Sequence, residues 1–262
     1  MQTEITSKDN SLVKEYKLLQ SQHKQRSKSG LFVIEGLRLC FDILSSGTVI
    51  KCIFYTKSIL NSSQGITNII ERAEKSVCVS DSIASHMSDT KSPQGVFCIC
   101  TANNSRVCSF EQGVLILEDI SDPNNMGTIL RTAEALGVFD IVLTDNCCDI
   151  FSPKVLRGSM GAVVRLNFHF TSDLPLLIHS LIKKKYTVVA SVVSCEAQSI
   201  RKIPKIKKTA IVIGNEANGL TKDTVNACTA KATIPMKGNA ESLNAAVAAA
   251  IILYELCGQE IK

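Results

Sequence analysis

The chain has 262 residues, of which 45% are hydrophobic and 20% charged, and its net charge is +5 at pH 7. This length suits two domains, and the composition is that of a globular protein, which excludes a fibrous or low-complexity chain. The mild positive charge is compatible with a nucleic-acid partner but does not require one.

Residues 1–102 predict a small α/β domain. Lysines alternate with leucine and valine at about residues 8–26, which predicts a polar, basic helix. The other elements that we expect here are helices and strands of ordinary length, with a turn before the last strand. They are strand 31–34, helix 36–46, strand 50–55, helix 66–75, strand 77–79, turn 92–95 and strand 96–100.

A polar stretch follows, and we place a linker at residues 103–112. Residues 113–262 predict a second domain, whose expected strands are continuous apolar runs typical of a parallel sheet covered on both faces. We therefore expect a doubly wound α/β domain. Its expected elements are strands 114–117, 139–143, 163–168, 186–191 and 210–213, with a helix at about 125–136 that Gly137 ends.

The last predicted helix, residues 245–256, is almost wholly apolar. It falls short of the ~18–20 apolar residues that a bilayer requires, so we expect no membrane span. A helix that is apolar on every side is a buried helix and must be covered on all faces. A second subunit would supply cover that a domain of this size lacks.

Eleven cysteines are scattered through the chain, with no Cys-x-x-Cys pair and no cysteine and histidine cluster of zinc-site spacing. Residues 1–4 lack the charged and apolar regions of a secretory signal. We expect free thiols in a reducing compartment, a cytoplasmic protein and no metal.

Three polar stretches stand where predicted strands end, which is where open α/β sheets place ligand sites. The first, residues 122–127, has turn chemistry and runs into a helix that carries Arg131. A guanidinium there suits phosphate or ribose oxygens, although a capped helix with a solvated arginine would have the same sequence.

The second stretch, residues 214–220, has Glu216 between two glycines and could be an ordinary strand-to-helix turn. It lacks both G-x-G-x-x-G and G-x-x-x-x-G-K-[ST], which disfavours dinucleotide and nucleoside triphosphate binding. The third stretch, residues 234–236 followed by residues 241–244, ends a predicted strand and opens the apolar helix. Ser242 is a competent N-cap, whereas Asn244, one turn into that helix, must find a partner or cost about 1–3 kcal/mol.

In this order and spacing, the three stretches resemble the SpoU branch of the SPOUT methyltransferases, which transfer a methyl group from S-adenosylmethionine to a ribose 2′-hydroxyl of RNA. The resemblance runs from about Val114 to Leu256. Weaker motifs in the first half resemble the family's substrate-binding domain, which is akin to some ribosomal RNA-binding proteins. They are residues 10–14, 32–36 and 93–96. Ala217 and Ala245 depart from the usual glycine and valine, but neither change removes a functional group.

The resemblance implies a trefoil knot in the C-terminal segment, a homodimer through the catalytic domain, S-adenosylmethionine as the cofactor and no metal. The residues that it places at the cofactor are Gly214, Asn215, Ile234, Met236 and Leu243. Those that it places at the reaction centre are Asn125, Arg131, Glu216, Ser242 and Asn244. We expect Arg131 to hold a phosphate and stabilise negative charge rather than act as a base.

We expect the basic residues of the first domain to contact RNA, and those at residues 183–185 and 201–208 to be solvated loop charges. The expected RNA-contacting residues are Lys14, Lys17, Lys24, Arg26 and Arg38. The two-domain arrangement resembles that of enzymes acting on ribosomal RNA more than that of the short transfer-RNA members, so we expect ribosomal RNA as the substrate. A transfer-RNA 2′-O-methyltransferase and a non-catalytic RNA-binding or ribosome-assembly protein stay open as alternatives. A nucleotide-dependent oxidoreductase is disfavoured because its phosphate loop is missing.

Overall fold

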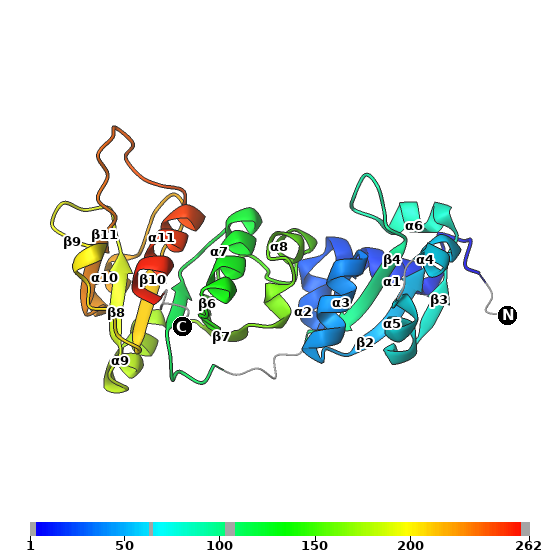
Figure 1. Ribbon diagram of the computed structural model, residues 1–262, viewed down its shortest axis with the longest axis horizontal. Coiled ribbons are helices and arrows are strands. Elements are labelled where there is room, and N and C mark those ends of the chain that lie inside the picture. The colour runs from blue at the N-terminus through cyan, green and yellow to red at the C-terminus, as the bar shows by residue number, and fades with distance from the viewer. Residues whose placement is uncertain (1–3, 63–64, 103–107, 258–262) are drawn as a thin grey trace. The chain divides into compact units, whose positions relative to one another are not determined.

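The computed structural model describes residues 4–62, 65–102 and 108–257 (Figure 1). By its contacts the chain divides into two compact units. The N-terminal unit comprises residues 1–103 and 151–164, and the C-terminal unit comprises residues 104–150 and 165–262. The domain boundaries given above stay a prediction. Half of the expected linker, residues 103–107, lies outside the described residues.

The N-terminal unit contains a four-stranded sheet in the order β1-β4-β2-β3. Its strands are β1 (Leu31–Glu35), β2 (Ile50–Tyr55), β3 (Ser76–Cys78) and β4 (Val96–Thr101). Its helices are α1 (Ser11–Ser21), α2 (His23–Ser29), α3 (Leu37–Ser46), α4 (Lys57–Ser62), α5 (Ile66–Arg72), α6 (Asp81–Met87), α8 (Pro153–Gly158) and the 3₁₀ helix η1 (Ala162–Val164). Tyr16 of α1 packs edge-on against Phe54 and Phe97 of the sheet, with ring centroids 5.9 and 5.6 Å apart, so α1 covers one face of the sheet. The sequence did not predict α4 or α6.

The single helix predicted at residues 8–26 is two helices. Gln22 adopts an extended conformation between α1 and α2, with φ −116° and ψ 113°. The guanidinium of Arg26 folds back and donates hydrogen bonds to the carbonyl oxygens of Leu19 and Gln20, at 2.6 and 3.1 Å. These carbonyls end α1 and would otherwise lack partners, so the break follows from a C-terminal cap supplied by the next helix.

The C-terminal unit contains a seven-stranded sheet in the order β7-β6-β5-β10-β8-β11-β9, with every pair parallel. The strands are β5 (Val114–Leu117), β6 (Asp140–Thr144), β7 (Asn167–Thr171), β8 (Thr187–Ser191), β9 (Gln198–Ser199), β10 (Thr209–Ile213) and β11 (Ala230–Thr233). The helices are α7 (Pro123–Ala135), α9 (Leu174–Lys183), α10 (Lys222–Ala227), α11 (Ala245–Cys257) and the 3₁₀ helix η2 (Ile200–Lys202). All residues of β5 and β10 are buried, and the predicted parallel α/β sheet is confirmed.

The predicted strand at residues 163–168 is wrong. Residues 162–164 form η1, and the strand β7 begins only at Asn167. The side chain of Asn167 donates to Asp140 Oδ1 at 2.8 Å, which sets the start of the pairing between β7 and β6. A short apolar run does not distinguish a buried helical turn from a strand. The apolar residue Val163 shows that this position is buried, but it does not show that the position is in a strand.

Helix α11 packs against α7 and β10, and Figure 1 shows α7 and α11 side by side. It buries Ala249, Ile252 and Leu253 in the unit. The predicted apolar helix is therefore present, but this chain does not cover all of it. Val247, Ile251 and Tyr254 are 48, 39 and 70% exposed, and their spacing of four and three residues places them on one face. No described helix is long and apolar enough to span a bilayer.

Candidate active site

The three polar stretches meet at one edge of the C-terminal unit. In a parallel sheet all carboxyl ends lie at the same edge. Glu118 follows β5, Gly214 follows β10 and Ile234 follows β11, and in the sheet β10 lies beside β5 while β8 separates it from β11. The parallel register of these strands therefore assembles the site from segments about a hundred residues apart.

The loop at residues 214–220 closes tightly on itself. The main chains of Asn215 and Gly219 exchange two hydrogen bonds of 3.1 and 2.9 Å. The side-chain oxygen of Asn215 accepts from the N–H groups of Ala217 and Asn218, and its amide nitrogen donates to the carbonyl of Asp119 at 2.8 Å. Asn215, which we predicted at the cofactor, thus uses its side chain to build the loop.

We expect Gly214→Ala to prevent this closure. A Cβ on Gly214 would lie 2.3 Å from the carbonyl carbon of Gly219, and backbone there cannot give way cheaply. The variant should lose about 1–3 kcal/mol of unfolding free energy and bind S-adenosylmethionine at least tenfold more weakly. Urea denaturation and calorimetry measure the two effects. Gly238→Ala, at which a Cβ meets nothing within 4 Å, is the control for stability.

Two acidic residues that sequence reasoning missed hold this edge together. Glu118, 5% exposed, accepts hydrogen bonds from the N–H and hydroxyl of Thr221 and from the hydroxyl of Thr224, at 3.0, 2.8 and 2.6 Å. Asp119 has a left-handed backbone, with φ 57°, and both its N–H and its carboxylate bond the hydroxyl of Thr144. An acid directly after a buried strand was the available signal for both residues, because such a carboxylate must be paired.

The carboxylate of Glu216 collects several donors from the first stretch. It accepts hydrogen bonds from the N–H groups of Ser121 and Asp122, at 3.2 and 3.0 Å, and from the side-chain amide of Asn125, at 3.1 Å. Burial raises the pKa of Glu216, but the bonds from Asn125 and the main chain outweigh it and lower the pKa to about 2. Glu216 is therefore ionised at neutral pH and too weak a base to remove a proton there.

Asn125 extends the chain of contacts to the third stretch. Its side-chain oxygen accepts a hydrogen bond of 2.9 Å from the amide of Asn244. The oxygen of Asn244 accepts from the N–H groups of Ala246 and Val247, so Asn244 is the N-cap of α11. Our expectation that this amide needs a partner is confirmed. Ser242, for which the sequence left an N-cap role open, does not cap the helix, because the helix begins only at Ala245 and Asn244 takes the cap.

Two of the predicted reaction-centre residues stay outside these contacts. Arg131 lies on the exposed face of α7 with Asn124 and Thr128, and Ser242 is exposed in the loop before α11. Among the described residues, neither side chain takes part in a hydrogen bond or ion pair. The structure thus joins Asn125, Glu216 and Asn244, and it leaves the guanidinium and the serine hydroxyl available to a ligand.

The predicted cofactor segment fits a ligand held through main-chain groups. From residue 235 to residue 243, no main-chain N–H or C=O bonds any other described residue. Ile234, Met236 and Leu243 are half-buried along this segment, and so supply apolar surface beside the unpaired polar groups. The loop, orange in Figure 1, stands out from the unit. Polar main chain beside apolar side chains suits a nucleoside with an amino-acid tail.

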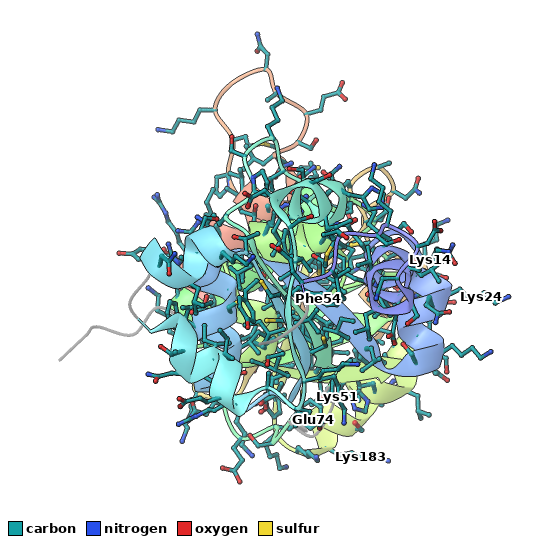
Figure 2. All side chains as sticks on the ribbon, turned by 90° about the vertical axis from the view of Figure 1, so that its right-hand side faces the viewer. Lys14, Lys24, Lys51, Phe54, Glu74 and Lys183 are labelled. Carbon is teal, nitrogen blue, oxygen red and sulfur yellow. The ribbon has the colours of Figure 1, made fainter. Side chains whose placement is uncertain are left out.

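The predicted RNA-contacting residues of the N-terminal unit differ in their surroundings. Lys14 pairs with Asp9 at 2.7 Å, and Lys17 donates to Gln20 at 2.5 Å. Lys24 and Arg38 are exposed, and Figure 2 shows Lys14 and Lys24 on the same side of the unit. Arg26 is only 7% exposed and caps α1, so its guanidinium does not face solvent. The described residues contain no cluster of metal-ligating side chains.

A parallel α/β sheet with its polar site at the carboxyl edge defines the class of protein: an α/β enzyme that binds a small ligand through the loops after its strands. A model of the SpoU rRNA Methylase family matches residues 112–254, and a model of the MRM3-like substrate binding domain matches residues 10–98. The chain belongs to the SpoU rRNA methylase family. The predicted family, enzyme class and methyl donor are thereby confirmed.

Whole-length relatives agree with this assignment. The chain is 30% identical over 258 residues to the 23S rRNA (guanosine(2553)-2′-O)-methyltransferase RlmP of Bacillus subtilis, covering 97% of this chain and 99% of that protein. It is 32% identical over 260 residues to an uncharacterized tRNA/rRNA methyltransferase of Synechocystis, covering 98% and 94%. The AdoMet-bound rRNA methyltransferase of Sinorhizobium meliloti has the same fold, with a TM-score of 0.83, 28% identity and 97% coverage of both chains.

Proposed function

We propose that this enzyme methylates a ribose 2′-hydroxyl of ribosomal RNA, with S-adenosylmethionine as the methyl donor. The observation that carries the proposal is the chain of hydrogen bonds from Ser121 and Asp122 through Glu216 and Asn125 to Asn244. It connects all three stretches that surround the expected reaction centre. A site organised around amides and one fixed carboxylate serves to position reactants rather than to remove a proton.

The roles of the residues follow from their chemistry. S-adenosylmethionine, when bound, supplies an electrophilic methyl group. Glu216 and Asn125 hold the loop after β5 against the loop after β10, which fixes the walls of the site. Alignment of reactants in this way can supply several kcal/mol of barrier reduction. Arg131 holds the phosphate next to the target nucleotide and stabilises negative charge on the attacking oxygen.

The family's whole-length relatives favour ribosomal RNA over transfer RNA. The Bacillus subtilis relative, named for 23S rRNA, aligns with both units, and a substrate-binding family model matches the N-terminal unit. A substrate-binding unit ahead of the catalytic one suits a large, structured RNA. The Synechocystis relative is named for both kinds of RNA, so transfer RNA is the alternative that the experiment must address.

Mapping of ribose methylation tests the proposal. Total RNA from cells that lack the protein is incubated with the pure enzyme and radiolabelled S-adenosylmethionine, and the ribosomal and transfer RNA fractions are separated. We expect one new alkali-resistant position in ribosomal RNA. If the label appeared only in the transfer RNA fraction, the substrate would be transfer RNA and not ribosomal RNA. Absence of label, with no calorimetric binding of S-adenosylmethionine, would leave a non-catalytic RNA-binding protein.

The finer structure of the catalytic unit also belongs to this proposal. A trefoil knot is supported by the position of α11, which follows β11 near one edge of the sheet yet contacts β10, α7 and η2. Lys205, in the segment after η2, pairs with Glu255 of α11 at 3.0 Å, so this segment lies against the helix. All eleven cysteines are free thiols, which supports a reducing, cytoplasmic setting.

A homodimer through α11 is the remaining part. Val247, Ile251 and Tyr254 form an exposed apolar face that this chain does not cover, and the family resemblance implies a second copy there. We expect Ile251→Arg to shift the protein from dimer to monomer in analytical ultracentrifugation, because the arginine would be buried unpaired. Leu60→Arg changes an equally exposed residue of the N-terminal unit (40% against 39%) and should stay dimeric. A wild-type monomer at micromolar concentration would contradict the assignment.

A further inference from the structure

A cavity in the N-terminal unit is lined by Arg38 and by residues of the motifs 32–36 and 93–96, and by none of the residues of the candidate active site. Its volume is about 340 Å³. The side chains that matter below are Glu35, Arg38, Leu39, Gln94, Arg157 and Met160. This volume falls in the range of small-molecule sites and suits one nucleotide. We refer to it as the Arg38 pocket.

The turn that shapes the pocket depends on one glycine. Gly36 joins β1 to α3 with φ 98°, a conformation that L side chains rarely adopt. The turn brings the N–H of Leu37 to the side-chain oxygen of Gln94, at 2.8 Å, which fixes the amide and turns its nitrogen away from that bond. That nitrogen is available as a donor to a ligand in the pocket.

The polar groups on the wall combine two guanidinium groups with one carboxylate. Arg38 is exposed and takes part in no hydrogen bond or ion pair among the described residues. Arg157 pairs through one nitrogen with Asp89, at 2.9 Å, which holds the guanidinium in place and leaves further donors. Two neighbouring guanidinium groups, one of them fixed, match the oxygens of a phosphate.

Glu35 supplies the acceptor. Its carboxylate receives hydrogen bonds from the hydroxyls of Ser88 and Thr90, at 2.5 and 2.8 Å, and from the N–H of Asp89, at 3.0 Å. Two carboxylate oxygens have about four acceptor positions, so one remains for a ligand donor. An amino group of a base or a ribose hydroxyl would satisfy it.

The remaining wall is apolar. Leu39 and Met160 are half-buried and line the pocket. Met160 has a left-handed backbone, with φ 52°, which is uncommon for a residue other than glycine and marks a position that its surroundings hold under strain. An apolar surface beside phosphate donors and one acceptor has the chemistry of a base, a phosphate and a sugar. A site for an anion alone would not need the apolar side chains of Leu39 and Met160.

We infer that the Arg38 pocket binds one unstacked nucleotide of the RNA substrate, distinct from the nucleotide that is methylated. Sequence-specific RNA recognition targets single-stranded nucleotides whose bases can leave the stack, and this pocket would hold one such base with its phosphate. The inference rests on the proposed function, since it takes the substrate to be RNA. It adds a site that selects the substrate.

Methyl NMR on the full chain tests this inference, with Met160 as a local probe assigned through the Met160→Leu variant. Three ligands are added separately: inorganic phosphate, an equimolar mixture of the four nucleoside 5′-monophosphates, and single-stranded RNA decamers. We expect the Met160 signal to shift with the decamers and, at about tenfold or higher concentration, with the mononucleotides, but not with phosphate. An equal response to phosphate, tighter binding of free nucleotides than of RNA, or no shift at all would overturn the inference.

Arg38→Ala should weaken the decamer response about tenfold, the loss expected for one charge-assisted hydrogen bond. Arg72→Ala removes the same charge from an exposed position of the same unit outside the pocket and should leave the response unchanged. Equal effects of the two variants would mean that RNA binding depends on positive charge in general and not on this pocket, which would contradict the inference. Calorimetry with S-adenosylmethionine on the same samples separates the hypotheses. Methyl-donor binding without a Met160 response rejects the pocket alone, and the reverse result rejects the proposed function alone.

Discussion

Arg131→Ala should reduce the turnover number for RNA methylation by about 100- to 1,000-fold while the dissociation constant of S-adenosylmethionine changes less than about twofold. The guanidinium lies on the exposed face of α7 and makes no bond among the described residues, so its removal costs the fold nothing. Its proposed role is confined to RNA, because we propose that it stabilises a phosphate and the developing charge on the attacking oxygen. Single-turnover kinetics with radiolabelled methyl donor and calorimetry measure the two quantities.

The matched control for this experiment is Arg201→Ala, which removes an equal charge from an exposed position of the same unit. We expect it to retain turnover within about twofold, as surface substitutions usually do. Arg131→Lys should recover only part of the activity, because an ammonium lacks the planar fork of the guanidinium. If Arg131→Ala lost donor binding and turnover to the same degree, Arg131 would belong to the cofactor pocket and not to the RNA.

Glu216→Gln should reduce turnover about 10- to 100-fold and lower the free energy of unfolding by about 1–2 kcal/mol at pH 7. The carboxylate accepts hydrogen bonds from the N–H groups of Ser121 and Asp122 and from the side-chain amide of Asn125, so every group that faces it is a donor. The amide nitrogen of a glutamine would face one of these donors and leave it unpaired. The loops after β5 and β10 would then separate, and the contact from Asn125 to Asn244 would loosen.

The pH dependence gives this prediction a second readout. Folding lowers the pKa of Glu216 from 4.5 to about 2, so its stabilisation is complete above pH 4.5 and is lost as the pH falls toward 2. The stability difference between wild type and Glu216→Gln should therefore be full at pH 7 and less than half as large at about pH 3. Urea denaturation at both pH values measures it. Glu196→Gln, at an exposed acid of the same unit, should show no such change. A difference that persists at low pH would mean that the carboxylate charge is not what holds the loops.

The strands of the second unit were predictable because burial on both faces leaves a direct trace in the sequence. The residues of β5 and β10 form unbroken apolar runs, and a parallel sheet needs them. The three polar stretches were predictable for a related reason, because each interrupts an apolar run at a strand end. Their order and spacing then sufficed to identify the family.

Local pattern failed where one apolar run could satisfy two structures. Val163 is buried, as its sequence suggests, but in a 3₁₀ turn and not in a strand. Local pattern also failed for one basic residue of the helix predicted at residues 8–26. Arg26 looked like a solvent-facing charge, yet it is buried as the cap of α1, because the carbonyls at that helix end needed donors and only the folded chain brings them together.

By itself, the amino-acid sequence determined the class of fold, the family and the residues proposed for the site, because apolar periodicity and motif spacing are properties of the chain. Only the tertiary structure decided which of those residues form hydrogen bonds with one another. It joined Glu216, Asn125 and Asn244 in one set of contacts, made Asn244 the cap of α11 and engaged Asn215 within its own loop. The physical reason is that a hydrogen bond across a hundred residues depends on strand order, which no local pattern encodes.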